Sequence, residues 1–270
     1  MKYLYITNNP KIAAVLDKND VVPWIDLEIN GKQERQKGRN TVISNHKVSD
    51  IKAVKEYTLN NPLLVRINPI NENSKEEIDS VLDAGADYIM LPMFYNKNDV
   101  EKFLNIVNGR CKTVLLIETK EAVENINSIL RLGGINRVHI GLNDLHLSYG
   151  LNFMFKLYSN GTVEKLCDCF KKYKIPFGIG GVANIGQGFI PGEFVLTEQK
   201  RLGSSCTILS RSFCDTSEFH DVMGFKKVFE SELLKLRNYE NAIQYCSSAF
   251  YDKNRDAMYT IINKIEEKQI

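Results

Sequence analysis

The feature that most constrains the fold is a regular alternation of short β-rich runs with amphipathic helical stretches along most of the chain. The eight runs span residues 2–7, 21–28, 63–69, 88–93, 112–119, 137–144, 176–181 and 206–210. Strands separated by helices form parallel sheets, because parallel neighbours need a crossover connection. Eight βα units followed by further helices predict a (β/α)8 barrel, or TIM barrel. An open doubly wound sheet is the alternative, although it usually has fewer strands.

Helix boundaries and chain length favour a single domain. Ser74 and Glu77 have the spacing of a capping box, and Thr119 can cap a helix that paired glycines end. From about residue 217 the chain has apolar residues at three- and four-residue steps, which predicts a C-terminal helical tail. No linker rich in Pro, Gly or Ser is present, and a TIM barrel commonly needs about 250 residues. We therefore expect one TIM-barrel domain over residues 1–270.

Composition disfavours several classes of function. A formal net charge of +2 gives no strong attraction to nucleic acid or to a membrane surface. No stretch of about 18 apolar residues is present, so no transmembrane helix is expected. The N-terminus turns polar too early for a signal peptide. Six cysteines in a chain of this length are typical of reduced thiols rather than of a disulfide framework. We predict a cytoplasmic protein that binds neither nucleic acid nor a membrane.

The active site of a TIM barrel lies at the C-terminal ends of the strands, so polar residues at these ends are the candidates. Alternation places Glu118 on the same strand face as Val114, and Asp144 on the same face of the next strand as Ile140. If both faces point inward, the two carboxylates repel unless a proton or a divalent cation lies between them. Mg²⁺ suits such a pair, because it leaves other positions to water or substrate oxygens. The alternative is that each acid caps the following helix.

Arg66 interrupts the apolar run LLVRINP, where a buried charge is costly without an anionic partner. Its guanidinium can bind a carboxylate through two hydrogen bonds and can stabilise a developing enolate oxygen. Asp26 and Glu28 end the neighbouring strand, so a structural salt bridge to either acid is the alternative. Such a bridge and a catalytic role can coexist.

Five motifs occur at successive strand ends, in the order WIDLE, VRINP, DAGADYIMLPM, LLIET and HIGLNDL. Together they resemble the HpcH/HpaI aldolase and citrate lyase β-subunit family, which has a phosphoenolpyruvate/pyruvate-type barrel, over residues 21–214. The resemblance implies Mg²⁺ or Mn²⁺ on Glu118 and Asp144, and a substrate-binding role for Arg66. It also implies retro-aldol or Claisen-type cleavage of a small 2-oxo or hydroxy acid, or of an acyl-CoA thioester. The metal and the arginine would stabilise the enolate.

The sequence departs from the family pattern at two positions. Aldolases of the family follow the strand-two acid with a histidine base, whereas here Ile29 follows Glu28. Citrate-lyase-like members often have a lysine after the LP pair on strand four, where this chain has Met93. His46, in the loop above strand two, is a candidate for the missing base, because imidazole suits proton transfer near neutral pH.

The candidate site therefore has two sets of residues in addition to the metal ligands. They are the catalytic residues Arg66, His46 and Glu28, and the substrate-binding residues Arg66, Asp26, Asn143 and Lys32. The helical tail and the family resemblance predict a homo-oligomer, either a trimer or a hexamer. Because the family histidine is missing, a non-catalytic barrel that binds an acidic metabolite or a partner protein is the alternative to a lyase.

Overall fold

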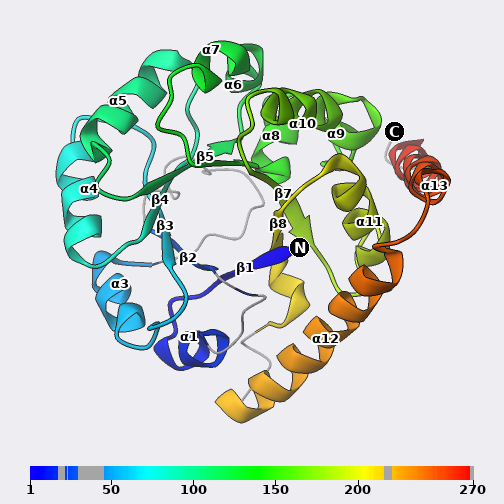
Figure 1. Cartoon of the computed structure of the whole chain (residues 1–270), viewed down its shortest axis with the longest axis horizontal. Coiled ribbons are helices and arrows are strands. Elements are labelled where there is room, and N and C mark those ends of the chain that lie inside the picture. The colour runs from blue at the N-terminus through cyan, green and yellow to red at the C-terminus, as the bar shows by residue number, and fades with distance from the viewer. Residues whose placement is uncertain (18–21, 23, 30–45, 216–220, 268–270) are drawn as a thin grey trace.

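The computed structural model describes residues 1–17, 22, 24–29, 46–215 and 221–267. Within these residues, eight parallel strands close into a barrel, in which each strand pairs with the next and the last pairs with the first. Figure 1 shows the ring of strands at the centre and the helices around it. The predicted (β/α)8 barrel with extra C-terminal helices is confirmed.

Every β-rich run of the sequence corresponds to one strand of the barrel. The strands are β1 (Lys2–Ile6), β2 (Trp24–Glu28), β3 (Leu63–Arg66), β4 (Tyr88–Leu91), β5 (Lys112–Ile117), β6 (Arg137–Ile140), β7 (Phe177–Val182) and β8 (Cys206–Leu209). The first helices are α1 (Pro10–Leu16), α3 (Val48–Lys55), α4 (Ser74–Asp83), α5 (Lys97–Val107), α6 (Lys120–Glu124), α7 (Ile126–Leu130) and α8 (Leu142–Ser148). They are followed by α9 (Lys156–Ser159), α10 (Thr162–Lys172), α11 (Gly192–Leu202), the 3₁₀ helix η1 (Arg211–Phe213), α12 (Val222–Ile243) and α13 (Ser248–Glu267).

Two apolar clusters hold the barrel together. The larger cluster fills the space between strands and helices, and includes outward-facing strand residues such as Leu115 and Ile117. The smaller cluster lies inside the barrel and consists of Leu4, Leu64, Met90, Val114, Leu116 and Cys206. The strands are apolar on both faces because parallel strands covered by helices are buried on both sides.

The predicted inward faces are right for β5 and wrong for β6. Val114 belongs to the interior cluster, so Glu118, four residues later, comes to the same face at the C-terminal end. β6 ends at Ile140, which packs outward, and the inward residue of this strand is His139. Asp144 therefore lies beyond the strand, in the first turn of α8.

The two predicted helix starts have different outcomes. Thr119 caps α6 as expected, because its side chain accepts a hydrogen bond from a backbone N–H of the first turn. Ser74 is the first residue of α4 rather than its cap, and its hydroxyl accepts the backbone N–H of Asn71 at 2.8 Å. The predicted capping box is wrong because Glu77 accepts hydrogen bonds from the backbone and side chain of Asn68 instead, at 3.0 and 2.7 Å.

The two C-terminal helices lie against the outside of the barrel. α12 packs on α1 and α11, and α13 packs on α9 and α11. Figure 1 shows both helices on one side of the molecule, outside the ring of strands. Of the helices that the structure describes, none is both long enough and apolar enough to cross a membrane.

Candidate active site

Four charged side chains meet inside the C-terminal end of the barrel. Asp26 and Glu28 come from β2, where a spacing of two residues puts both on its inward face. Arg66 comes from the end of β3 and is the register partner of Glu28. Glu118 directly follows β5. All four are buried, with at most 7% of the residue exposed.

Arg66 is held by both acids of β2. Its Nη2 lies 2.5 Å from Oδ2 of Asp26, and its Nη1 lies 3.2 Å from Oε1 of Glu28. The predicted salt bridge is therefore present with both partners. Burial lowers the pKa of Arg66, but Asp26, Glu28 and Glu118 raise it above its usual value, so the guanidinium stays charged. Its buried Nε–H has no hydrogen-bond partner among the described residues.

Asp26 is fully buried, the most deeply buried member of the cluster. Its Oδ1 has no hydrogen-bond partner in the described part of the chain. Burial raises the pKa of its carboxyl group and the charge of Glu28 raises it further, against the opposing effect of Arg66. Three carboxyl groups thus share one guanidinium, and the cluster carries excess negative charge whenever all of them are ionised.

His46 joins the cluster from the segment before α3. Its Nδ1 accepts a hydrogen bond from the backbone N–H of Glu28 at 3.0 Å, and its backbone forms an isolated bridge with Ile29. Because an N–H points at Nδ1, that nitrogen carries no proton, and the neutral ring is protonated on Nε2. In this tautomer His46 donates through Nε2. The predicted role as a base would require the other tautomer, which cannot accept the Glu28 N–H.

Backbone groups position Glu118. Its Oε2 accepts a hydrogen bond from the backbone N–H of Met93 at 3.3 Å, and Met93 has a φ of 46°, in the left-handed region. Gly141, directly after β6, leaves space for the carboxylate, because a Cβ at this residue would lie 2.7 Å from Cγ of Glu118. A glycine at a strand end is a sequence signal for such a close approach. Nothing in the sequence signals the conformation of Met93.

The remaining predicted residues lie around this cluster. Asp144, in the first turn of α8, is 8% exposed, and its carboxylate accepts no hydrogen bond within the described residues. Asn143, one residue earlier, is exposed and is not part of the buried cluster. Lys32 lies outside the described residues. The structure therefore brings together Asp26, Glu28, His46, Arg66 and Glu118, with Asp144 just beyond β6.

The donor set fits a hard divalent cation that also binds substrate. No group of three or more His, Cys, Asp or Glu side chains is arranged to hold a metal among residues 1–17, 22, 24–29, 46–215 and 221–267. Two carboxylates do follow adjacent strands, Glu118 directly after β5 and Asp144 in the first turn of α8, and Mg²⁺ commonly takes one or two carboxylates with waters and substrate oxygens. The excess negative charge of the cluster is compatible with such an ion.

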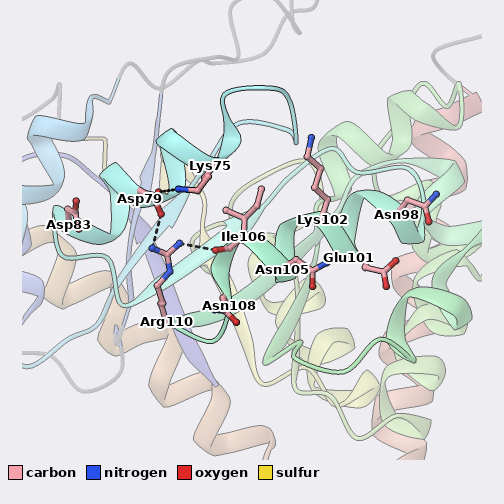
Figure 2. A pocket seen from close by; sticks show the side chains of 10 residues that line it. All are labelled: Lys75, Asp79, Asp83, Asn98, Glu101, Lys102, Asn105, Ile106, Asn108 and Arg110. Atoms are coloured by element: carbon pink, nitrogen blue, oxygen red, sulfur yellow. Dashed lines mark hydrogen bonds and ion pairs between the residues drawn. The ribbon is translucent and has the colours of Figure 1, made fainter.

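A wide hollow of about 960 Å³ lies elsewhere, on the outer surface along α4 and α5 (Figure 2). Three of its six charged residues are paired with one another: Asp79 contacts Lys75 at 2.8 Å and Arg110 at 2.7 Å. None of the predicted site residues lines it. We assign the active site to the barrel mouth, because clusters of buried, perturbed ionisable groups are typical of functional sites.

Comparison with known proteins identifies a family and similar folds. The chain matches the HpcH/HpaI aldolase/citrate lyase family over residues 8–154. No curated protein sequence matches it. One similar structure is an HpcH/HpaI aldolase from Desulfitobacterium hafniense DCB-2, with a TM-score of 0.59, 14% identity, and coverage of 87% of this chain and 92% of that one.

Two further structures are similar to the same extent. An HpcH/HpaI aldolase/citrate lyase family protein from Burkholderia cenocepacia J2315 has a TM-score of 0.61 and 14% identity, and the match covers 87% of this chain and 94% of that one. The citrate synthase SbnG has a TM-score of 0.58 and 13% identity, with coverage of 89% and 94%. At such low identities these likenesses show the fold alone.

Proposed function

Because the chain belongs to the HpcH/HpaI aldolase/citrate lyase family of lyase-type enzymes, we propose that it is a metal-dependent carbon–carbon lyase. Its substrate would be a small 2-oxo or hydroxy acid, either free or as an acyl-CoA thioester, that reacts through an enolate. The observation that carries the proposal is the buried arginine at the barrel mouth, held by two carboxylates and within the electrostatic influence of the candidate metal ligand Glu118.

Arg66 supplies a fixed positive charge to the enolate. Asp26 and Glu28 each take one N–H of the guanidinium, which leaves three of its five N–H groups for substrate oxygens. A donor that is already oriented in a site shielded from water stabilises developing charge more strongly than water does. A Mg²⁺ or Mn²⁺ ion on Glu118 and Asp144 would act as a Lewis acid that polarises the oxo group of the substrate.

The remaining residues have distinct roles in this proposal. In the cleavage direction Glu28 takes the proton of the substrate hydroxyl, and the electrons left on that oxygen form a carbonyl as the carbon–carbon bond breaks. The electron pair of the broken bond moves into the enolate of the other fragment. His46 donates from Nε2 to a substrate oxygen, in the tautomer that the Glu28 N–H imposes. Asp26 fixes the plane of Arg66. Contacts of Asn143 and Lys32 with the distal part of the substrate stay predictions from the sequence.

The test combines metal binding with turnover. Mg²⁺ or Mn²⁺ should raise the melting temperature of the wild type, because a ligand at 100 times its Kd stabilises the folded state by about 2.7 kcal/mol. Asp144→Ala and Glu118→Ala should each abolish the shift, whereas Asp79→Ala, on the outer surface, should leave it intact. A shift that survives in both site variants would show that the shared metal site is wrong.

Turnover is measured as release of pyruvate or acetate from a panel of hydroxy acids, oxo acids and their CoA thioesters. Metal-dependent release that is lost in Glu118→Ala would support the lyase. Binding of oxo acids without release of any product across the panel would favour the non-catalytic barrel instead.

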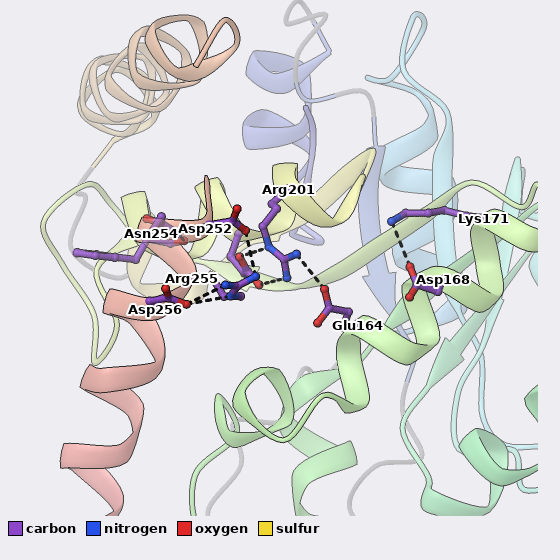
Figure 3. Close-up of polar contacts among 10 residues, drawn as sticks. Glu164, Asp168, Lys171, Arg201, Asp252, Asn254, Arg255 and Asp256 are labelled. Atoms are coloured by element: carbon purple, nitrogen blue, oxygen red, sulfur yellow. Dashed lines mark hydrogen bonds and ion pairs between the residues drawn. The ribbon is translucent and has the colours of Figure 1, made fainter. Parts of the chain in front are cut away.

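We also propose that the chain forms a homo-oligomer, a trimer or hexamer. α12 leaves Met223 and Leu234 exposed, with 70% and 58% of the residue accessible. α13, in contrast, is bound to its own barrel: Asn254 donates to the backbone carbonyl of Phe194 at 3.1 Å, close to the ion pairs of Arg201 shown in Figure 3. Light scattering at micromolar concentration tests the proposal, and a stable monomer would reject it.

A further inference from the structure

The loop after β4 is attached to the end of β5 by two hydrogen bonds of opposite direction. The backbone N–H of Met93 donates to Oε2 of Glu118 at 3.3 Å. The hydroxyl group of Thr119, the next residue, donates to the backbone carbonyl of Phe94 at 2.6 Å. Two adjacent residues of the loop therefore bind two adjacent residues at the end of β5.

The hydroxyl of Thr119 has a fixed direction. Its Oγ1 accepts the backbone N–H of Ala122 at 3.1 Å, as the cap of α6. Because the oxygen accepts this N–H, the hydroxyl proton is directed to the Phe94 carbonyl. Thr119 is 1% exposed and Phe94 is 2% exposed, so water has little access to compete for these bonds.

Met93 has a backbone conformation that residues other than glycine rarely adopt, with a φ of 46°. Such a conformation persists only where the surrounding structure enforces it, and it concentrates at functional sites. Here the enforcement comes from Phe94, whose side chain packs in the outer core and whose carbonyl is bound by Thr119. The result of the strained turn is an amide N–H directed at Glu118.

From this geometry we propose that Thr119 is a positioning residue, which acts through the strained Met93 backbone to hold Glu118 ready for a divalent cation. The inference rests on the proposed function, in which Glu118 is one of two protein ligands. A carboxylate whose orientation is already fixed loses less side-chain freedom when it binds the ion. Removal of a group that hydrogen-bonds a metal-ligating side chain and fixes its orientation typically lowers metal affinity by about 10–100-fold.

Two variants of Thr119 distinguish the effect of its hydroxyl group from the effect of its side-chain volume. Thr119→Val removes the hydroxyl at nearly constant volume, and Thr119→Ser keeps it. We expect the Mn²⁺ dissociation constant of the full chain, measured by titration calorimetry, to rise about tenfold or more in Thr119→Val. Thr119→Ser should bind Mn²⁺ like the wild type.

Because Thr119→Val also removes a helix cap, a matched control is needed. Asn9 caps α1 by accepting the backbone N–H groups of Lys11 and Ile12, and makes no contact with Glu118. Asn9→Ala should lower the melting temperature of the metal-free protein to a similar extent and leave the Mn²⁺ affinity unchanged. An equal loss of affinity in both variants would show that the effect is one of general stability, and would overturn the inference.

Two variants of Met93 test the backbone itself and leave both caps intact. Met93→Gly keeps the N–H and adopts a positive φ without steric cost, so it should bind Mn²⁺ like the wild type. Met93→Val should weaken binding, because a β-branched residue disfavours that conformation. If both variants lose affinity equally, the side chain rather than the N–H matters, and the inference is wrong.

The outcomes separate this inference from the proposed function. Equal Mn²⁺ affinity of the wild type and Thr119→Val would overturn the positioning role and leave the metal centre standing. A wild type that does not bind Mn²⁺ would reject the metal centre and the positioning role together. If Thr119→Val does not fold, the Met93 pair decides the question.

Discussion

The interior of this barrel changes character over a few residues of the same strand. On β2, Trp24 lies in the N-terminal half, against the apolar interior cluster, whereas Asp26 and Glu28 lie in the C-terminal half with Arg66. Two residues of a strand span only about 7 Å. The N-terminal half is thus stabilised by packing, and the C-terminal half concentrates charges whose burial is costly without partners.

The buried ionisable groups of the two halves also differ in charge state. In the N-terminal half, His139 is buried, its Nε2 donates to the carbonyl of Gly180 at 3.1 Å, and burial lowers its pKa to about 3, so the ring is neutral. In the C-terminal half, Arg66 stays charged because carboxylates surround it. The N-terminal half therefore serves stability, and the C-terminal half keeps the charges that the proposed binding and chemistry require.

Loss of the Arg66 charge should produce the largest effect on stability. Arg66→Met leaves three buried carboxyl groups without their cation, and removal of one partner from a buried ion pair typically costs about 3–5 kcal/mol. Asp26→Asn should cost much less, because Arg66 keeps Glu28 as a partner and the excess negative charge falls. Urea unfolding at pH 7 measures both. Equal losses would show that the cluster depends on the individual pair rather than on its charge balance.

Arg66→Lys tests function in the same half. The variant should fold and bind metal but lose about a hundredfold or more in turnover, because an ammonium group cannot reproduce the planar guanidinium fork. The measurement is kcat together with the melting temperature. A lower melting temperature with near-wild-type kcat would make Arg66 purely structural and remove it from the mechanism.

A pH series tests the neutral state of His139. Between pH 6.5, its usual pKa, and the folded value of about 3, the unfolded chain binds a proton that the folded chain does not. Stability should therefore fall as pH drops through this range, by about 1.4 kcal/mol per pH unit from this group. His139→Gln should lack this part of the slope. Urea unfolding at pH 7 and pH 5 gives the comparison, and parallel profiles for the two proteins would contradict it.

The sequence predicts the barrel because alternation of strands and helices is a long-range pattern that does not depend on exact strand ends. The same pattern does not fix which residues of a short strand face the interior, and the predicted inward face of β6 was therefore wrong. His139 rather than Ile140 faces the interior, because His139 is the register partner of the inward-facing Leu116 and Ile140 that of the outward-facing Ile117. The pairing of Arg66 with the acids of β2 was predictable, because a charge in an apolar strand needs a partner and β2 is its neighbour.

Other parts of the site depend on local geometry that residue types do not encode. Asp144 lies in the first turn of α8, where each residue turns by about 100°, so strand alternation does not set the direction of its side chain. The sequence pattern expected a strand there. The N–H that Met93 donates to Glu118 depends on a positive φ, which a methionine rarely adopts. Such a contact becomes visible only in three dimensions.

The smallest effect is expected at the N-terminal end of the barrel, where Arg137 lies over the ring of Trp24 at 4.9 Å from its centroid. Its Nη2 also donates to Oγ of Ser205 at 2.5 Å. Arg137→Lys keeps the charge but loses the planar stacking, and should cost about 0.5–1 kcal/mol in the free energy of unfolding. Trp24 is the single tryptophan of the chain, so its fluorescence spectrum reports the loss of this contact directly.

Turnover and Mn²⁺ affinity should stay at wild-type values, since the contact lies at the opposite end of the interior from Arg66 and Glu118. A change in Mn²⁺ affinity would mean that the two halves are coupled, and the separation of stability from function along the barrel axis would be wrong.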